Sequence, residues 1–161
     1  MSELLKEDKI ISDLQAQFAS LAGQARVQRA RRLWAEAPPA DFDAVLGALV
    51  EKYEFGKLCT ITGQDEGDSF SATYHMARTD GIVLNLKVKV PKTSPVWHSI
   101  CSKFPGCVNY EREIADLFGV KFEGLPPGPR YPLPDDWPEG QYPLRKDWNG
   151  NVAPDKEGGK S

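Results

Sequence analysis

The fold is decided by three runs of sequence: KLCTIT (57–62), SFSATYHMA (69–77) and IVLNLKVKV (82–90). They are separated by GQDEGD (63–68) and TDG (79–81), which are strong turn signals. In the third run, apolar residues alternate with less apolar ones such as Asn85, Lys87 and Lys89, a pattern typical of a half-exposed strand. The sequence therefore predicts three consecutive strands in an antiparallel meander.

A helix is predicted on each side of these strands. Before them, Asp41 is a suitable N-cap, apolar residues follow at helical spacing over residues 42–53, and Gly56 suits the C-terminal stop. After them, residues 108–118 form a second clear helical pattern, which Gly119 closes.

The N-terminal part adds one more helix and one more strand. Residues 4–21 are close to helical spacing, and residues 25–33 alternate imperfectly between apolar and basic side chains. The basic face of that strand consists of Arg26, Arg29, Arg31 and Arg32. The expected fold is therefore a single α+β domain over residues 1–119, in the order α-β-α-β-β-β-α, with a mostly antiparallel or mixed sheet.

The chain changes character after Gly119, and residues 120–150 are predicted to be an extended arm. Eight prolines lie in residues 124–154, the last of them Pro154, and proline excludes helix and central strand. Large side chains such as Trp137, Tyr142 and Trp148 are interleaved with charges, which is unlike a disordered linker. The arm therefore needs a groove, on its own domain or on a partner that orders it. Residues 151–161 are polar, rich in glycine and expected to be disordered.

Composition excludes several classes of function. The net charge of −3 argues against a nucleic-acid-binding surface. No run approaches the roughly 20 apolar residues that span a bilayer, and the charged N-terminus is unlike a signal peptide. The three cysteines are odd in number and form no CxxC pair, which is typical of reduced thiols. We therefore expect a protein of the cytoplasm, or of an equivalent reducing compartment, that reaches a membrane only through partners.

The residues offer few candidates for a reaction centre. Glu113 and Asp116 could form an acid–base pair on the helix 108–118, but no nucleophile, histidine or glycine-rich loop lies near them in sequence. A charged helix face is therefore favoured, in which these carboxylates pair with Arg130, Arg145 or Lys146 or with a neighbouring protein. The alternative is a stand-alone thiol- or metal-dependent enzyme that uses Cys59, Cys101, Cys107 and His98.

Two separated motifs narrow the choice between these two classes of protein. One is E-R-E-x-x-D-L-F-G-V-x-F-x-G from Glu111 to Gly124, and the other is P-L-R-K-D from Pro143 to Asp147. In this order they resemble the C-subunit family of respiratory complex I, the NADH:quinone oxidoreductase. That family includes the equivalent subunits of energy-converting membrane NiFe hydrogenases and formate hydrogenlyases. The resemblance extends from about Phe42 to Trp148.

The resemblance implies a cofactor-free subunit of the peripheral arm, on the cytoplasmic side, that docks on the large catalytic subunit and neighbouring iron–sulfur subunits. Iron–sulfur clusters and a NiFe centre or quinone would then belong to those partners. Leu125 and Pro129 stand where the family usually has His and Arg. The proline-rich run that follows resembles the hydrogenase branch more than complex I proper, so the hydrogenase branch is expected and complex I proper is the alternative. The residues expected to contact partners are Glu111, Arg112, Glu113, Asp116, Phe118, Gly119, Arg130, Asp136, Trp137, Leu144, Arg145, Lys146, Asp147 and Trp148.

Overall fold

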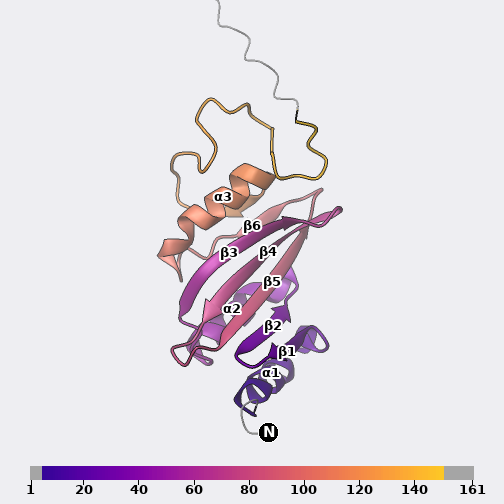
Figure 1. Cartoon of the computed structure of the whole chain (residues 1–161), viewed down its shortest axis with the longest axis vertical. Coiled ribbons are helices and arrows are strands. Elements are labelled where there is room, and N and C mark those ends of the chain that lie inside the picture. Colours follow the sequence, from indigo (N-terminus) through magenta and orange to yellow (C-terminus); the bar gives the residue numbers. More distant parts are fainter. Residues whose placement is uncertain (1–4, 151–161) are drawn as a thin grey trace, which may run out of the picture.

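A computed structural model describes residues 5–150 and shows a mixed sheet with helices packed against it (Figure 1). The expected disordered tail, residues 151–161, lies outside the described residues. The helices are α1 (Leu5–Gln17), α2 (Pro39–Glu51) and α3 (Val108–Phe118), with short 3₁₀ turns η1 (Ala19–Leu21) and η2 (Pro105–Cys107). The strands are β1 (Ala25–Arg29), β2 (Arg32–Glu36), β3 (Lys57–Asp65), β4 (Ser69–Ala77), β5 (Val83–Pro91), β6 (Val96–His98) and β7 (Lys121–Glu123).

The main sheet has the strand order β1-β2-β5-β4-β3. All neighbours are antiparallel except β2 and β5, which are parallel. The predicted meander β3-β4-β5 and the α+β fold class are thus confirmed. The register aligns buried side chains in rows across the strands, for example Ala35, Leu86 and Tyr74, because alternate residues of a strand point to the same face.

The helices cover the apolar face of this sheet. The ring of Phe42 in α2 lies 4.8 Å from the ring of Tyr74, and the ring of Phe118 in α3 lies 5.9 Å from that of Phe70. Both partners are on β4 and four residues apart, so they face the same side. α3 comes especially close at Gly63 of β3, where a Cβ would stand 2.9 Å from side-chain atoms of Ile114 and Phe118.

The predicted strand over residues 25–33 is wrong, because this segment is a hairpin of two strands. β1 and β2 pair antiparallel across a turn at Ala30 and Arg31, and Arg31 has a φ of +60°. A tight hairpin turn needs positive φ values, which glycine or asparagine usually supplies. Since neither residue is present here, the turn left no sequence signal, and the parallel partner of β5 was missed.

Several element ends also differ from the prediction. α2 begins at Pro39, so Asp41 lies in its first turn and Pro38 is the N-cap. The same helix ends at Glu51, before the expected stop at Gly56. β3 continues to Asp65, three residues beyond the predicted strand. β7 lies within the range predicted as arm and pairs with β6 in a parallel two-stranded sheet.

His98 ties this small sheet to α2. Its Nδ1 lies 3.1 Å from Oδ2 of Asp43, and its Nε2 lies 3.3 Å from Oε2 of Glu123. The hydrogen bond and charge of Asp43, followed by those of Glu123, raise the pKa of His98 above its ordinary value of 6.5. Because folding favours the protonated ring, His98 contributes stability that is fully present below pH 6.5 and is lost as the pH rises through the raised pKa.

We therefore expect His98→Asn to weaken the pH dependence of stability. The difference in urea midpoint between the wild type and the variant should be largest near about pH 5.5 and smallest near about pH 8.5. The effect will be small, because all three side chains are more than half exposed and water screens their charges. Denaturation curves at both pH values measure it. A difference that does not change with pH would assign no role to the charge of His98.

Candidate partner-binding surface

The surface is built on α3 and the arm that follows it. On α3, residues 111, 114 and 118 are buried, at the spacing of a single helix face, while Glu113 is exposed. Gly119 ends the helix in the left-handed conformation, with a φ of +71°, and its amide donates to the carbonyl of Ala115. The chain then forms β7 and crosses back over the solvent side of α3 (Figure 1).

Arg112 holds the first part of the arm. Its Nη2 donates to the carbonyls of Pro126 and Pro127 at 3.2 and 3.1 Å. Gly128 follows at such close range that a Cβ would stand 2.0 Å from the same Nη2. A side chain at residue 128 would therefore displace the guanidinium from the carbonyls that it binds.

Asp116 holds the middle of the arm. Arg130 approaches one carboxylate oxygen with Nε at 2.8 Å and Nη2 at 2.7 Å, and the amide of Leu133 donates to the other oxygen at 3.0 Å. Arg130 also donates from Nη1 to the carbonyl of Trp137 at 2.6 Å. The predicted pairing of Asp116 with a basic residue of the arm is confirmed for Arg130. No partner of Glu113 is found among residues 5–150.

Gln141 links the two tryptophans of the arm. The indole of Trp137 donates to the Gln141 carbonyl at 2.9 Å, and that of Trp148 donates to its side-chain oxygen at 3.0 Å. The two ring centroids are 6.2 Å apart. Both indole N–H groups thus find their acceptors within the arm itself, an arrangement that residue spacing alone did not predict.

Arg145 fastens the end of the arm to the domain. Its Nε donates to the Phe118 carbonyl at 2.7 Å, and its guanidinium lies over the rings of Phe70 and Tyr142 at 5.0 and 4.4 Å. Gly119 makes room for this contact, since a Cβ there would stand 2.5 Å from Tyr142 and 2.6 Å from Arg145. Gly119 is therefore required twice, for its positive φ and for the close approach.

Asp65, at the end of β3, provides a further anchor. Its carboxylate accepts from the backbone amide of Lys146 at 2.8 Å and from that of Gly67 at 2.8 Å, and it lies 2.7 Å from Nζ of Lys92. Burial opposes its ionisation, but the hydrogen bond from Lys92 and those from the two amides outweigh burial and lower the pKa of Asp65. The sequence indicates only that Asp65 lies in a turn, because nothing in it marks a turn carboxylate as a long-range acceptor.

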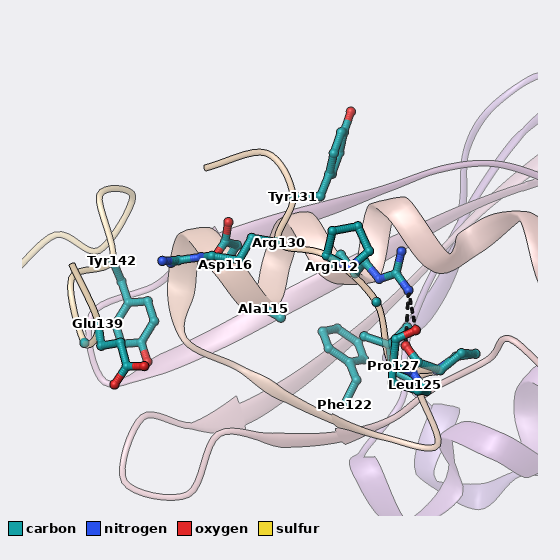
Figure 2. Close-up of a pocket in the computed structure, with 14 residues that line it drawn as sticks. Arg112, Ala115, Asp116, Phe122, Leu125, Pro127, Arg130, Tyr131, Glu139 and Tyr142 are labelled. Carbon is teal, nitrogen blue, oxygen red and sulfur yellow. Dashed lines mark hydrogen bonds and ion pairs between the residues drawn. The ribbon is translucent and has the colours of Figure 1, made fainter. Parts of the chain in front are cut away.

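A hollow of about 570 Å³ lies between α3 and the arm. Figure 2 shows Arg112 at one end of it and Glu139 and Tyr142 at the other. Its walls combine charged groups with apolar surface from Phe122 and Leu125. The arm therefore arches over the helix, and the two enclose a recess of mixed polarity.

The predicted contact residues separate into three groups. Glu111 and Phe118 are buried in the domain. The prediction that Glu111 contacts a partner is therefore wrong, and its carboxylate instead accepts from the Ser99 hydroxyl and from the Ile100 amide. Another set holds the arm in place: Arg112, Asp116, Gly119, Arg130, Trp137, Arg145 and Trp148. The exposed remainder consists of Glu113, Asp136, Leu144, Lys146 and Asp147.

The four residues of the thiol or metal alternative do not form one site. Cys59 is exposed on β3, and His98 pairs with carboxylates as described above. Cys101 and Cys107 do come together, with their Sγ atoms 3.2 Å apart, next to Glu111. The structure thus brings together two of the four residues.

The mixed sheet and the arm folded over α3 describe the fold, and the family match assigns the class of protein: an α+β subunit of a complex I-like redox assembly. The family model described as "Respiratory-chain NADH dehydrogenase, 30 Kd subunit" matches residues 35–153, and the chain belongs to this family. Membership confirms the resemblance that the two sequence motifs carried.

Relatives from several kinds of complex are similar to the chain. The C subunit of the F(420)H(2) dehydrogenase of Methanosarcina mazei is 33% identical over 144 residues, which cover 88% of this chain and 90% of the relative. The beta subunit of the membrane-bound hydrogenase of Pyrococcus furiosus is 40% identical over 91 residues, 54% of this chain and 53% of the relative. Among solved structures, a chain of the membrane-bound sulfane sulfur reductase, an archaeal respiratory membrane complex, superposes with a TM-score of 0.79 at 25% identity, covering 90% of this chain and 86% of that one. Within residues 5–150, no helix has the length and apolar character to cross a bilayer.

Proposed function

We propose that this chain is a docking subunit in the peripheral arm of a complex I-like membrane redox complex, that it contributes no cofactor of its own, and that it binds the large catalytic subunit through the arm and α3. Its partners would supply the iron–sulfur clusters and the NiFe centre or quinone. The assembly would stand on the cytoplasmic side of the membrane and hold the chain there through the partner subunits.

One observation carries this proposal. The described residues expose three large apolar side chains, Leu5, Tyr131 and Leu144, and two of these are on the arm. Leu144 is 52% exposed although its own amide donates to the Leu117 carbonyl and the next residue, Arg145, is bound to Phe118. Apolar side chains held outward on a fixed segment are typical of the anchors of an interface.

The hydrogenase branch is the one that we propose for the complex. The run of residues 131–138 carries this assignment, together with the similarity to the Pyrococcus furiosus relative. The alternative is the NADH:quinone oxidoreductase proper, and the description of the matching family favours it. The large subunit that co-purifies distinguishes the two, because a NiFe-binding protein has nickel ligands that a quinone-reactive one lacks.

Leu144→Asp and Tyr131→Asp are expected to prevent assembly. A buried, unpaired carboxylate in an interface costs several kcal/mol, so recovery of the large subunit with a tagged chain from native membranes should fall by about tenfold or more. Leu5→Asp is the matched control, since it places the same charge on an exposed leucine far from the arm. Equal recovery of the complex from all three variants would refute docking through the arm. Quantitative mass spectrometry of the affinity-purified membranes provides the measurement.

A further inference from the structure

Two thiols meet beneath the N-terminus of α3. Cys101 lies in the turn after β6, and Cys107 is the N-cap residue of α3. Their Sγ atoms are 3.2 Å apart, which is hydrogen-bonding distance for sulfur. Cys107 is buried and Cys101 is partly exposed, so reagents in solution can reach the pair from the side of Cys101.

The geometry fits a dithiol better than a metal centre. Two thiolates on a tetrahedral zinc ion, with Zn–S bonds of about 2.3 Å, stand about 3.8 Å apart, further than these sulfurs. The third potential ligand, Glu111, already accepts from the amide of Ile100 at 2.8 Å and from the hydroxyl of Ser99 at 2.6 Å. The described residues therefore supply three potential ligand atoms, and the carboxylate among them already accepts from these two donors and, at 3.5 Å, from Sγ of Cys101.

We propose that Cys101 and Cys107 form a reversible redox site, at which a small-molecule disulfide oxidises the pair to an intramolecular disulfide. The two sulfurs have to approach by about 1.2 Å to reach the S–S bond length of about 2.05 Å. In the exchange, one S–S bond of the oxidant breaks and one forms in the protein. Two electrons pass from the cysteines to the oxidant, and both thiol protons end on the two small thiols released.

The surroundings of the two thiols determine the order in which they react with the oxidant. Cys101 is the accessible thiol, so it exchanges first and forms the mixed disulfide. Cys107 then attacks that disulfide from inside and releases the second small thiol. Burial, followed by the hydrogen bond with Cys101 and the charge of Glu111, raises the pKa of Cys107, so the second step should accelerate as the pH rises.

The test treats the reduced, full-length chain with oxidised glutathione and counts its free thiols by alkylation and intact mass. Whether the exposed Cys59 remains free or is capped by one glutathione, Cys101 and Cys107 should lose both thiols, and the disulfide between them by itself lowers the mass by about 2 Da. Trypsin cuts after Lys103, between the two cysteines, so the disulfide should join peptides 93–103 and 104–112. Dithiothreitol should separate them again.

Matched serine variants give the site its controls. The Cys59→Ser variant should form the disulfide as the wild type does. In the Cys107→Ser variant the reaction should end at a glutathione adduct on Cys101. Circular dichroism confirms that each variant is folded. The proposal is overturned if Cys101 and Cys107 stay fully alkylatable while Cys59 reacts. It is also overturned if zinc added alone binds stoichiometrically in native mass spectra and both Cys101→Ser and Cys107→Ser abolish that binding, because the pair is then a metal centre.

Discussion

Glu111→Ala is expected to lower the free energy of unfolding by about 3 kcal/mol, because it leaves the Ile100 amide and the Ser99 hydroxyl without their acceptor and removes the longer contact with the Cys101 thiol. The side chain is fully buried, and its carboxylate accepts from the Ile100 amide and the Ser99 hydroxyl. Each such orphaned group costs about 1–3 kcal/mol, and removal of the buried charge offsets part of the sum. Urea denaturation followed by tryptophan fluorescence measures the loss.

Glu111→Gln separates the hydrogen bonds from the charge. The amide oxygen of glutamine can still accept from Ile100, and the Ser99 hydroxyl can rotate to accept from the new amide. We therefore expect a loss of only about 1 kcal/mol. Losses of equal size in the two variants would mean that the negative charge, and not the accepted hydrogen bonds, is what the domain needs at residue 111.

Asp116→Ala is expected to release the middle of the arm, at a cost of about 3 kcal/mol. It breaks the ion pair with Arg130 and orphans the Leu133 amide, and the Asp116 side chain is only 10% exposed. A buried pair broken on one side costs about 3–5 kcal/mol, and the partial exposure of Arg130 reduces this value. Limited proteolysis should reveal new cleavage within residues 125–150 together with the loss of stability.

Glu113→Ala is the matched control for Asp116→Ala. It removes the same charge from the same helix three residues earlier, but Glu113 is exposed. Its effect on stability should remain within about 0.5 kcal/mol. If the two alanine variants unfold at the same urea concentration, the contacts of Asp116 do not hold the arm.

Local patterns predicted most of the fold. Alternation in residues 82–90 and helical spacing in residues 42–53 were sufficient, because burial on one face follows directly from a regular backbone. The missed hairpin at Arg31 shows the limit. Its turn uses residues without a characteristic preference, and the parallel pairing of β2 with β5 joins segments about 50 residues apart, which no local pattern encodes.

The sequence predicted that the motif residues lie together, but not which groups they contact. The motif residues do lie together, yet many of them contact their own chain, because charge and spacing do not reveal which groups a folded arm will cover. Glu111 could have been placed correctly, since it shares the spacing of the buried Ile114 and Phe118. Asp65 and Gln141 could not, as their partners are set by the path of the arm.

The sequence left open whether the arm lies on its own domain or on a partner that orders it; these contacts place it on its own domain, which has a thermodynamic consequence for the proposed docking. Asp116, Arg145 and Asp65 hold the arm before any other protein arrives. If a partner docks on the exposed residues of the arm, as we propose, it meets a segment that is already folded, so little conformational entropy remains to be lost. The heat capacity change of association should then match the apolar area of the contact alone, without the larger contribution of a segment that folds as it binds.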